Sequence, residues 1–208
     1  ECCYCSLSIV RLSVNFRVWI PAHVPACASG RAPASGPAAV PILAIDQGSS
    51  STKALVVGPD QDVLSIAEIP LQPTLRPDGG VELDPDALLV SVREAGRRAV
   101  VAARVPIEAV GVANLGASVL AWDRASGRPL SPVIARHDRR SAGVCAQLTD
   151  AGYAADLMRI TGLPLDPQFA APKLAWLRGT VGPGGVVTTV DTWLLHQLSG
   201  AFVPDTST

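Results

Sequence analysis

Two short apolar runs, joined by a turn of small polar residues, constrain the fold of this chain more than any other feature. Residues 41–45 (PILAI) and 53–57 (KALVV) are mostly aliphatic and too short for helices, so both are predicted to be strands. The sequence between them, DQGSSST, is typical of a turn. A third strand is expected over residues 63–69, after a turn at residues 58–60. The folded part therefore begins with a predicted β-meander.

Strands and helices follow one another in the rest of the chain. A long helix is expected after Asp84, since Asp84 can cap it and Pro85 suits the first helical position. In the last helix, Asp191 is the expected cap and Gly200 follows the end. The pattern predicts an α/β domain with a mixed sheet flanked by helices. The other expected elements are strands over 107–113 and 118–122 and helices over 138–149, 171–178 and 191–198.

Residues 1–40 differ in character from the remainder. They contain four of the five cysteines and end in a linker-like ASGRAPASGP sequence. We expect an unstructured or mispredicted extension here, the latter meaning upstream DNA read as protein; a regulatory arm is the alternative. Cys2, Cys3 and Cys5 lack the paired spacing of a zinc site, so no metal is predicted there. The folded domain is expected over residues 41–208.

The charge balance excludes several classes of partner. The net charge is −1 and the pI is about 6.3, so neither nucleic acid nor an anionic membrane surface is expected as a partner. The apolar stretch over residues 9–24 is too short and too charged to span a bilayer, and it lacks the features of a secretory signal. A cytoplasmic location is predicted. Basic residues are nearly all arginine, with lysine only at Lys53 and Lys173.

The turn at residues 46–52 has the chemistry of a phosphate site. A glycine lets backbone N–H groups approach phosphate oxygens, and consecutive hydroxyls add donors. Asp46, at the end of a buried strand, suits Mg²⁺, and Lys53 adds a positive charge. The alternative is an ordinary hairpin with a polar tip. The pattern is not a P-loop, because no G-x-x-x-x-G-K-[ST] sequence occurs.

Blocks along the chain resemble the FGGY family of carbohydrate kinases, especially its glycerol kinase-like members. Residues 46–53 (DQGSSSTK) resemble the first phosphate motif of that family. The other blocks come in the family's order and extend the resemblance over about residues 41–208. They are GVELDP at 80–85, the strands of 109–121 with WDR at 122–124 and GRPL at 127–130, DRR at 138–140, TGLPLDP at 161–167 with PKLAWL at 172–177, and TVDTWLLHQLSG at 189–200.

The resemblance implies the N-terminal domain of an actin-like (ribonuclease H-like) ATPase fold. It further implies ATP and Mg²⁺ as cofactors and transfer of the γ-phosphoryl group to a hydroxyl of a sugar or polyol. On the matching positions, Asp46 would serve the Mg²⁺, and Ser49, Ser50, Ser51 and Lys53 would contact phosphates. The family's catalytic base and adenosine pocket lie in its C-terminal domain. We therefore expect a truncated chain with no catalytic residue and no activity alone, and a homo-oligomer only through the full-length protein.

The substrate positions depart from the glycerol kinase pattern. Where those kinases carry an Arg and a Glu that bind substrate hydroxyls, this chain has Gly116 and Ala117. Arg136 replaces a family Trp and Gln168 a family Tyr. Losing hydroxyl-binding groups is costly for specificity, so glycerol itself is disfavoured.

Three interpretations stay open for this pocket. In the first, the pocket binds a different sugar through Arg136, His137 and Gln168 beside Asp138. In the second, the chain is an inactive kinase-like binding module. In the third, it is a gene remnant. The Arg136–Asp138 run is alternatively a surface charge cluster.

Overall fold

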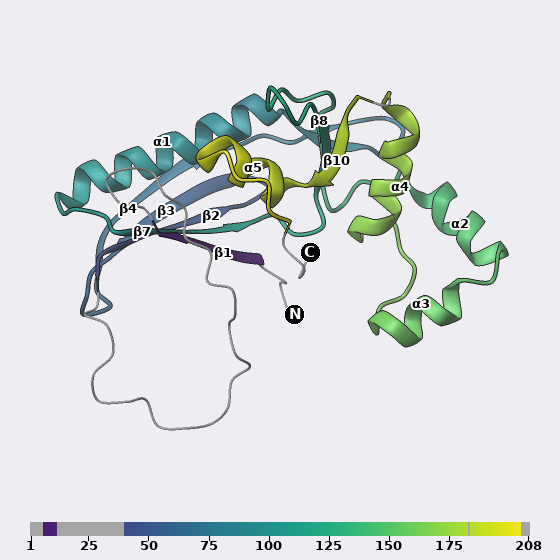
Figure 1. Ribbon diagram of the computed structural model, residues 1–208, viewed down its shortest axis with the longest axis horizontal. Coiled ribbons are helices and arrows are strands. Elements are labelled where there is room, and N and C mark those ends of the chain that lie inside the picture. The colour runs from purple at the N-terminus through teal and green to yellow at the C-terminus, as the bar shows by residue number, and fades with distance from the viewer. Residues whose placement is uncertain (1–5, 12–39, 183, 205–208) are drawn as a thin grey trace.

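The computed structural model describes residues 6–11, 40–182 and 184–204, which form two five-stranded sheets and the helices α1 to α5 (Figure 1). The elements in chain order are β1 (Ser6–Arg11), β2 (Ile42–Gln47), β3 (Ser51–Val57), β4 (Val63–Pro70), β5 (Thr74–Leu75), β6 (Val81–Leu83), α1 (Pro85–Ala103), β7 (Ala109–Asn114), β8 (Val119–Trp122), β9 (Val133–Ile134), α2 (Ala142–Asp150), α3 (Ala154–Thr161), α4 (Ala170–Thr180), β10 (Val186–Thr189) and α5 (Val190–Ser199).

The first sheet has the strand order β1-β7-β2-β3-β4. Strands β2, β3 and β4 pair antiparallel in sequence order, which confirms the predicted meander. The chain then crosses through α1 and returns as β7, which pairs parallel with β2. The sheet is therefore mixed, as the sequence predicts, and the parallel pair places the carboxyl ends of β2 and β7 at the same edge.

Helix α1 forms where its sequence predicts and covers one face of this sheet (Figure 1). The Asp84 carboxylate accepts a 2.9 Å hydrogen bond from the Asp86 N–H, so Asp84 is the N-cap. The apolar stripe of α1 is buried against β2, β3 and β4, and each fully buried Leu or Val contributes about 1.5–3 kcal/mol. The buried residues of this layer are Leu43, Ile45, Ala54, Val56, Leu88, Val92, Ala95 and Ala99.

The second sheet has the order β10-β8-β9-β6-β5 and carries α4 on one face. Val119, Ala121, Ile134 and Leu177 form a small core between β8, β9 and α4. Helices α2, α3 and α4 lie together on the side of the molecule away from α1 (Figure 1). The start of α4 lies next to the loop between β7 and β8, because the Lys173 side chain of α4 bonds to Ala117 in that loop.

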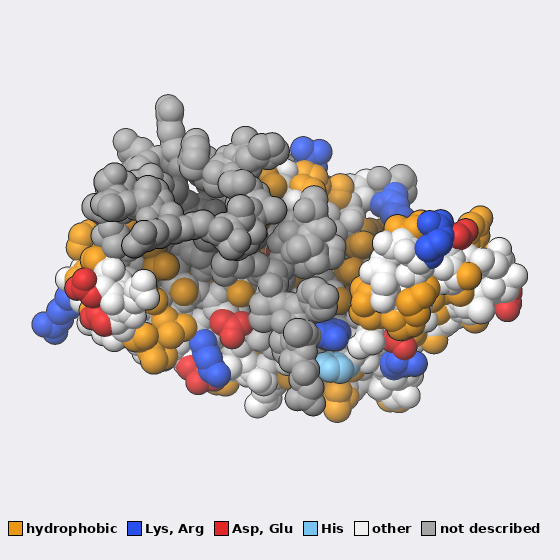
Figure 2. All heavy atoms as spheres, turned by 90° about the horizontal axis from the view of Figure 1, so that it is seen from below, with side chains coloured by type: hydrophobic (Ala, Val, Ile, Leu, Met, Phe, Trp, Pro, Cys, Tyr) orange, Lys and Arg blue, Asp and Glu red, His pale blue; other side chains and the backbone are white. Residues whose placement is uncertain are grey.

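The face of the first sheet opposite α1 carries exposed apolar and charged side chains. Asp46, Lys53 and Glu68 lie on this face, and Ile66 is 64% exposed. Figure 2 shows the molecule from below, where apolar side chains lie beside a few charged ones. No helix in the described ranges combines the length and hydropathy needed to cross a membrane.

Several elements differ from the sequence-based expectation. The helix expected from residue 138 begins at Ala142, because Asp138 is buried in ion pairs instead. Thr189, not Asp191, is the N-cap of α5, and Asp191 lies in the first turn; Gly200 ends the helix in the left-handed region, as predicted. Elements without a prediction are β5, β6, β9, β10 and α3.

Strand β1 lies within the segment for which the sequence indicates no regular structure. It pairs antiparallel with β7 at the edge of the first sheet. The rest of the expected extension, residues 1–5 and 12–39, lies outside the described residues, and so do Cys2, Cys3, Cys5 and Cys27.

Candidate functional site

The predicted phosphate turn is the tight connection between β2 and β3, and we call residues 46–53 the phosphate hairpin. The Gly48 N–H donates a 2.9 Å hydrogen bond to the Ser51 carbonyl, which leaves Ser49 and Ser50 at the tip. A Cβ at position 48 would lie 3.1 Å from the Ser51 carbonyl oxygen, so glycine allows this close approach. The Leu71 N–H holds the Ser50 carbonyl at 2.8 Å. The tip is thus held by backbone bonds, and its side chains are left for a ligand.

Asp46 and Lys53 stand directly opposite each other on β2 and β3. Both are exposed, because their neighbours in the strands, such as Ile45 and Ala54, face α1. Within the described part of the chain, neither side chain forms a hydrogen bond or an ion pair. The hairpin therefore presents one carboxylate and one ammonium group that remain available to a ligand.

The run of four hydroxyls splits into two groups. Thr52 is fully buried, and its Oγ1 lies 2.6 Å from the Ser91 Oγ of α1. Ser49, Ser50 and Ser51 are at least partly exposed. Strand alternation explains the split, since Thr52 faces the same side as the core residues of β3. Thr52 anchors the hairpin, and the three serines are the hydroxyls that a phosphate can reach.

The loop after β7 lies beside the phosphate hairpin. Gln47, at the end of β2, pairs with Asn114, at the end of β7, so the chain that follows each strand leaves at the same edge of the sheet. Gly116 and Ala117 are in the loop that follows β7. Ligands of open α/β sheets bind outside the carboxyl ends of the strands. The structure thus brings these predicted pocket positions to the same edge as the hairpin.

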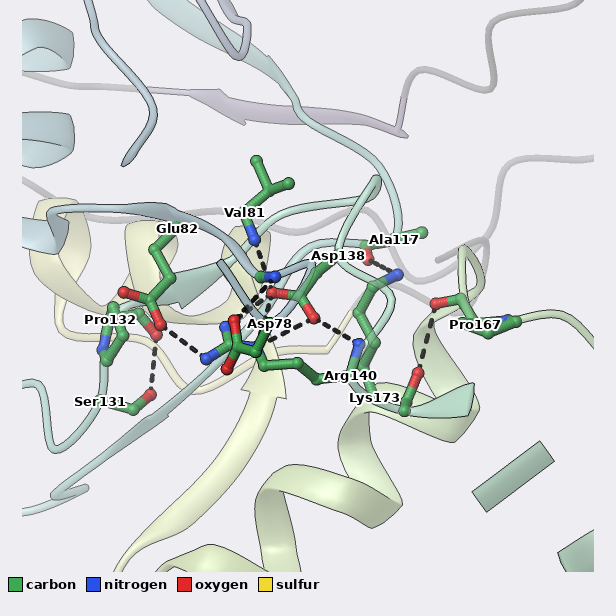
Figure 3. A network of polar contacts seen from close by, with 12 residues as sticks. Asp78, Val81, Glu82, Ala117, Ser131, Pro132, Asp138, Arg140, Pro167 and Lys173 are labelled. Atoms are coloured by element: carbon green, nitrogen blue, oxygen red, sulfur yellow. Dashed lines mark hydrogen bonds and ion pairs between the residues drawn. The ribbon is translucent and has the colours of Figure 1, made fainter. Parts of the chain in front are cut away.

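Three of the other predicted pocket positions, Arg136, Asp138 and Gln168, lie near the buried amine of Lys173, a residue outside the predicted site. The Lys173 Nζ, on α4, donates to the carbonyls of Ala117 at 3.2 Å and Gln168 at 2.6 Å. The charges of Asp138 and Arg136 act on the pKa of the same amine, so both lie nearby. Figure 3 shows Lys173 reaching toward Ala117, with Asp138 beside it. Three chain segments far apart in sequence therefore converge here.

Glu82, Asp138 and Arg140 form what we call the ion-pair cluster (Figure 3). The Arg140 guanidinium lies 2.6 Å from Asp138 and 2.7 Å from Glu82, and it lies over the Trp176 ring at 4.9 Å from the centroid. The exposed fractions of the three side chains are 15% for Arg140, 16% for Glu82 and 1% for Asp138. These are buried charges that compensate one another, a geometry that is costly to break.

Asp138 is fully engaged in this cluster. Its Oδ2 accepts from the Val81 N–H at 2.8 Å and from Arg140, and its Oδ1 accepts from the Arg140 N–H at 2.9 Å. Burial alone would raise the pKa of Asp138, but the hydrogen bonds from Arg140 and Val81 outweigh it and hold the pKa below its usual value. The carboxylate would reach a substrate only by breaking these bonds.

The structure separates the three residues of the Arg136–Asp138 run. Asp138 is buried, so the run is not a surface charge cluster as a whole. His137 is exposed and Arg136 is half-buried. The two basic side chains are consequently the members of this run that are accessible to a ligand, while the aspartate supports the loop that carries them.

The Asp46 carboxylate suits Mg²⁺ held mainly by water and phosphate. No group of three or more His, Cys, Asp and Glu side chains gathers at one point within the residues that the structure describes. Mg²⁺ keeps several waters and binds through one or two carboxylates together with substrate phosphates. The single exposed carboxylate of Asp46 beside the phosphate turn fits that mode of binding.

An apolar groove of about 340 Å³ lies elsewhere, between α1, α5 and strands β2 and β7. Its walls include Leu43, Val100, Val112 and Leu198, with Arg93 and Arg97 also in the lining. None of the predicted site residues lines it. The groove lies on the α1 side of the sheet, whereas Asp46 and Lys53 are on the opposite face, so we do not assign it to the phosphate chemistry.

The comparison with known families decides the assignment. A model of the N-terminal domain of the FGGY family of carbohydrate kinases matches residues 41–208. The chain belongs to this family. As an FGGY chain it has the α/β fold of the N-terminal domain of an actin-like ATPase, which confirms the fold class predicted from the sequence.

The known FGGY proteins that this chain resembles are longer than the part that it matches. A glycerol kinase of Aromatoleum aromaticum is 40% identical over 76% of this chain and 34% of its own length. The structure of Plasmodium falciparum glycerol kinase with ADP has a TM-score of 0.71 at 23% identity, covering 77% of this chain and 34% of that protein. Gluconate kinase from Lactobacillus acidophilus has a TM-score of 0.70 at 18% identity, covering 78% and 34%. The chain thus spans about a third of the curated relatives it matches.

Proposed function

We propose that this FGGY chain provides the phosphate- and sugar-facing half of an ATP-dependent kinase that phosphorylates a hydroxyl of a sugar or polyol. The observation that carries the proposal is the position of the phosphate hairpin. Asp46 and Lys53 are exposed at the edge where the Gly116–Ala117 loop also begins. A phosphate chain and a hydroxyl acceptor held at this edge would lie next to each other, as transfer between them requires.

The residues of the hairpin have separate roles in this proposal. Asp46 binds Mg²⁺, directly or through water, while the hydroxyls of Ser49, Ser50 and Ser51 and the Lys53 ammonium contact phosphate oxygens. ATP, as its magnesium complex, supplies the phosphoryl group. Phosphoryl transfer depends mainly on positioning and charge neutralisation, and these residues supply both. No residue of this chain is assigned as the general base, and no turnover is expected from the chain alone.

The pocket favours a substrate other than glycerol. Gly116 and Ala117 offer no side-chain polar group where glycerol kinases carry an Arg and a Glu. Arg136, His137 and Gln168 supply the side-chain donors and acceptors instead, and the hydrogen bonds of Asp138 to Val81 and Arg140 fix the end of the loop that carries the first two. A site built on different hydrogen-bonding groups selects a different pattern of hydroxyls. We therefore propose a sugar or polyol other than glycerol.

The same loss of polar groups at positions 116 and 117 supports a second candidate. In that case the chain is a kinase-like binding module, or a remnant, which retains the fold without a matching catalytic half. The two candidates differ in turnover. A kinase half gives sugar-dependent ADP release once it is joined to a C-terminal FGGY domain, whereas a binding module gives none.

Restoring the glycerol-binding side chains tests the location of the pocket. We expect the wild-type chain to show no amide shifts in ¹⁵N spectra on addition of glycerol. The variant G116R/A117E should gain glycerol-dependent shifts at residues 115–118, because it recreates the missing donor and acceptor. Glycerol shifts in the wild type, or none in a folded variant, would contradict the assignment. The matched control is G143R, an exposed position of α2 with open space around it.

A further inference from the structure

We propose that Lys173 is the positioning residue of the substrate pocket: its ammonium group fastens the Gly116–Ala117 loop to the segment that carries Gln168. That these segments form the pocket rests on the proposed function, whereas the bonds that join them are observed in the structure. The resemblance assigns Lys173 no contact with phosphate, metal or substrate. Its role follows from what its side chain contacts.

Lys173 is buried to a degree that lysine seldom shows. It is 1% exposed and lies in the first turn of α4, with Pro172 and Leu177 as buried neighbours in the helix. Taking an ammonium group out of water is costly unless hydrogen bonds replace the lost hydration. A methionine or leucine would fill the same space without that cost. The buried charge therefore calls for an explanation in terms of its partners.

Three carbonyl groups supply the partners. Nζ donates to Gln168 at 2.6 Å, to Ala117 at 3.2 Å and to Phe169 at 3.3 Å. A lysine ammonium has three protons, so the three acceptors match its donors. Two of the acceptors are within five residues of Lys173, but Ala117 is 56 residues away in sequence. The bond to Ala117 is the one that joins separate parts of the pocket.

The loop that receives this bond has an unusual backbone. Ala117 has φ of +57°, in the left-handed region that residues other than glycine seldom adopt. A loop held in such a conformation needs support from its surroundings. The Lys173 bond acts on the carbonyl of this residue, so it fixes the direction in which the loop presents Gly116 and Ala117 to a ligand.

The charged groups around Lys173 come from several elements. Burial lowers the pKa of Lys173 to about 8, with Arg136 acting in the same direction, while Asp138, Asp166 and Cys145 act to raise it. At neutral pH the amine is therefore mostly protonated and retains all three donors. Arg136 and Asp138 belong to one loop of the predicted pocket. The charges of this loop, which is the third segment of the pocket, therefore also act on the pKa of the Lys173 amine.

Nitrogen NMR of the wild-type chain tests the bonds directly. The chain has two lysines, so labelling with ¹⁵Nζ-lysine gives two side-chain signals, assigned with Lys53→Arg. We expect the Lys173 signal to show slowly exchanging protons and couplings across hydrogen bonds to the carbonyl carbons of Ala117 and Gln168. The Lys53 signal should show neither feature. A slowly exchanging Lys173 signal with no coupling to Ala117, or a fast-exchanging one, would overturn the proposal.

Hydrogen exchange of variants tests the positioning. Lys173→Met should speed amide exchange about tenfold in both 115–118 and 166–169, as expected for losing a charge-assisted hydrogen bond. The matched control Lys53→Met should leave both stretches unchanged. Faster exchange confined to α4 in Lys173→Met would show a local structural role and overturn the proposal. If Lys173→Met fails to fold, the wild-type couplings decide.

A titration with gluconate separates this inference from the proposed function. If gluconate shifts the amides of both segments in the wild type, Lys173→Met should weaken its binding about tenfold, because a displaced loop loses aligned contacts. Equal affinity in the two proteins would contradict the positioning role. Absence of gluconate and other sugar binding in the wild type would count against the proposed function, while the Lys173 couplings would still test the bonds.

Discussion

The phosphate hairpin and the ion-pair cluster carry charges in opposite ways. In the hairpin, Asp46 and Lys53 are exposed and have no ion-pair partner within the described part of the chain. In the cluster, Asp138 is buried and Arg140 is mostly buried, and they are bonded to each other and to neighbours. Sequence motifs contain both kinds of charge and do not distinguish them. The free charges are available to a ligand, whereas the satisfied charges hold the segment around Asp138 and Arg140 against β6.

The largest expected effect comes from removing Arg140. Arg140→Met leaves the buried carboxylate of Asp138 and the partly buried carboxylate of Glu82 without their cation, and breaking a buried pair in this way costs about 3–5 kcal/mol. Urea denaturation measures the free energy of unfolding. We expect a loss in that range, with a visibly lower midpoint.

Arg97→Met is the matched control for this prediction. Arg97 pairs with Glu94 on the exposed side of α1, where solvent screens the interaction. The unfolding midpoint should stay near that of the wild type. If Arg140→Met and Arg97→Met lowered the free energy of unfolding equally, the ion-pair cluster would contribute no more to stability than an exposed ion pair, which would contradict the comparison.

A pH effect at Lys173 ranks second. The pKa of Lys173 is about 8 in the folded chain and 10.5 in its ordinary state, so between these values the unfolded chain holds a proton that the folded chain has lost. Unfolding then takes up a proton, and the free energy of unfolding rises with pH. Relative to Lys173→Met, the wild type should gain on the order of 3 kcal/mol from pH 8 to 10.5. A constant difference across that window would contradict the burial of the charged amine.

Two hydroxyls of the same motif should differ in their effect on stability. Thr52→Val removes the buried partner of Ser91 and should cost about 1–2 kcal/mol of unfolding free energy. Ser50→Ala, at the exposed tip, should change it by less than about 0.5 kcal/mol. Calorimetry of both variants in one buffer makes the comparison. A larger loss of unfolding free energy for Ser50→Ala than for Thr52→Val would mean that Ser50, and not Thr52, anchors the hairpin.

The smallest expected effect on stability is at the exposed pair. Asp46→Asn and Lys53→Met should each shift the free energy of unfolding by about 0.5 kcal/mol or less, because neither side chain has a partner to lose among the described residues. Thermal denaturation checks this. A loss of several kcal/mol would show that these residues hold the fold together and are not kept for a ligand.

The sequence predicts the hairpin well because its structure is local. Apolar runs of five residues around a polar turn specify the two strands, and strand alternation then places Asp46 and Lys53 on one face. The helix over α1 is equally local, with Asp84 and Pro85 at its start. The resemblance to the FGGY family adds the order of the blocks and their chemistry.

The pocket is less predictable, because long-range contacts define it. Asp138 looks like a ligand-binding group in sequence, but its carboxylate accepts a hydrogen bond from the N–H of Val81, 57 residues earlier. The role of Lys173 depends on a carbonyl of Ala117, whose backbone conformation no propensity indicates. The rarity of lysine in this chain draws attention to the residue, but only the folded structure shows what it bonds.

The most direct test of the proposed phosphate site is a titration of the ¹⁵N-labelled chain with ATP, with and without Mg²⁺. We predict amide shifts concentrated at residues 48–51, with an additional Mg²⁺-dependent component that Asp46→Asn abolishes while the protein stays folded. Shifts located away from the hairpin, or a Mg²⁺ response that Asp46→Asn leaves intact, would contradict the assignment of the phosphates and the metal to this turn.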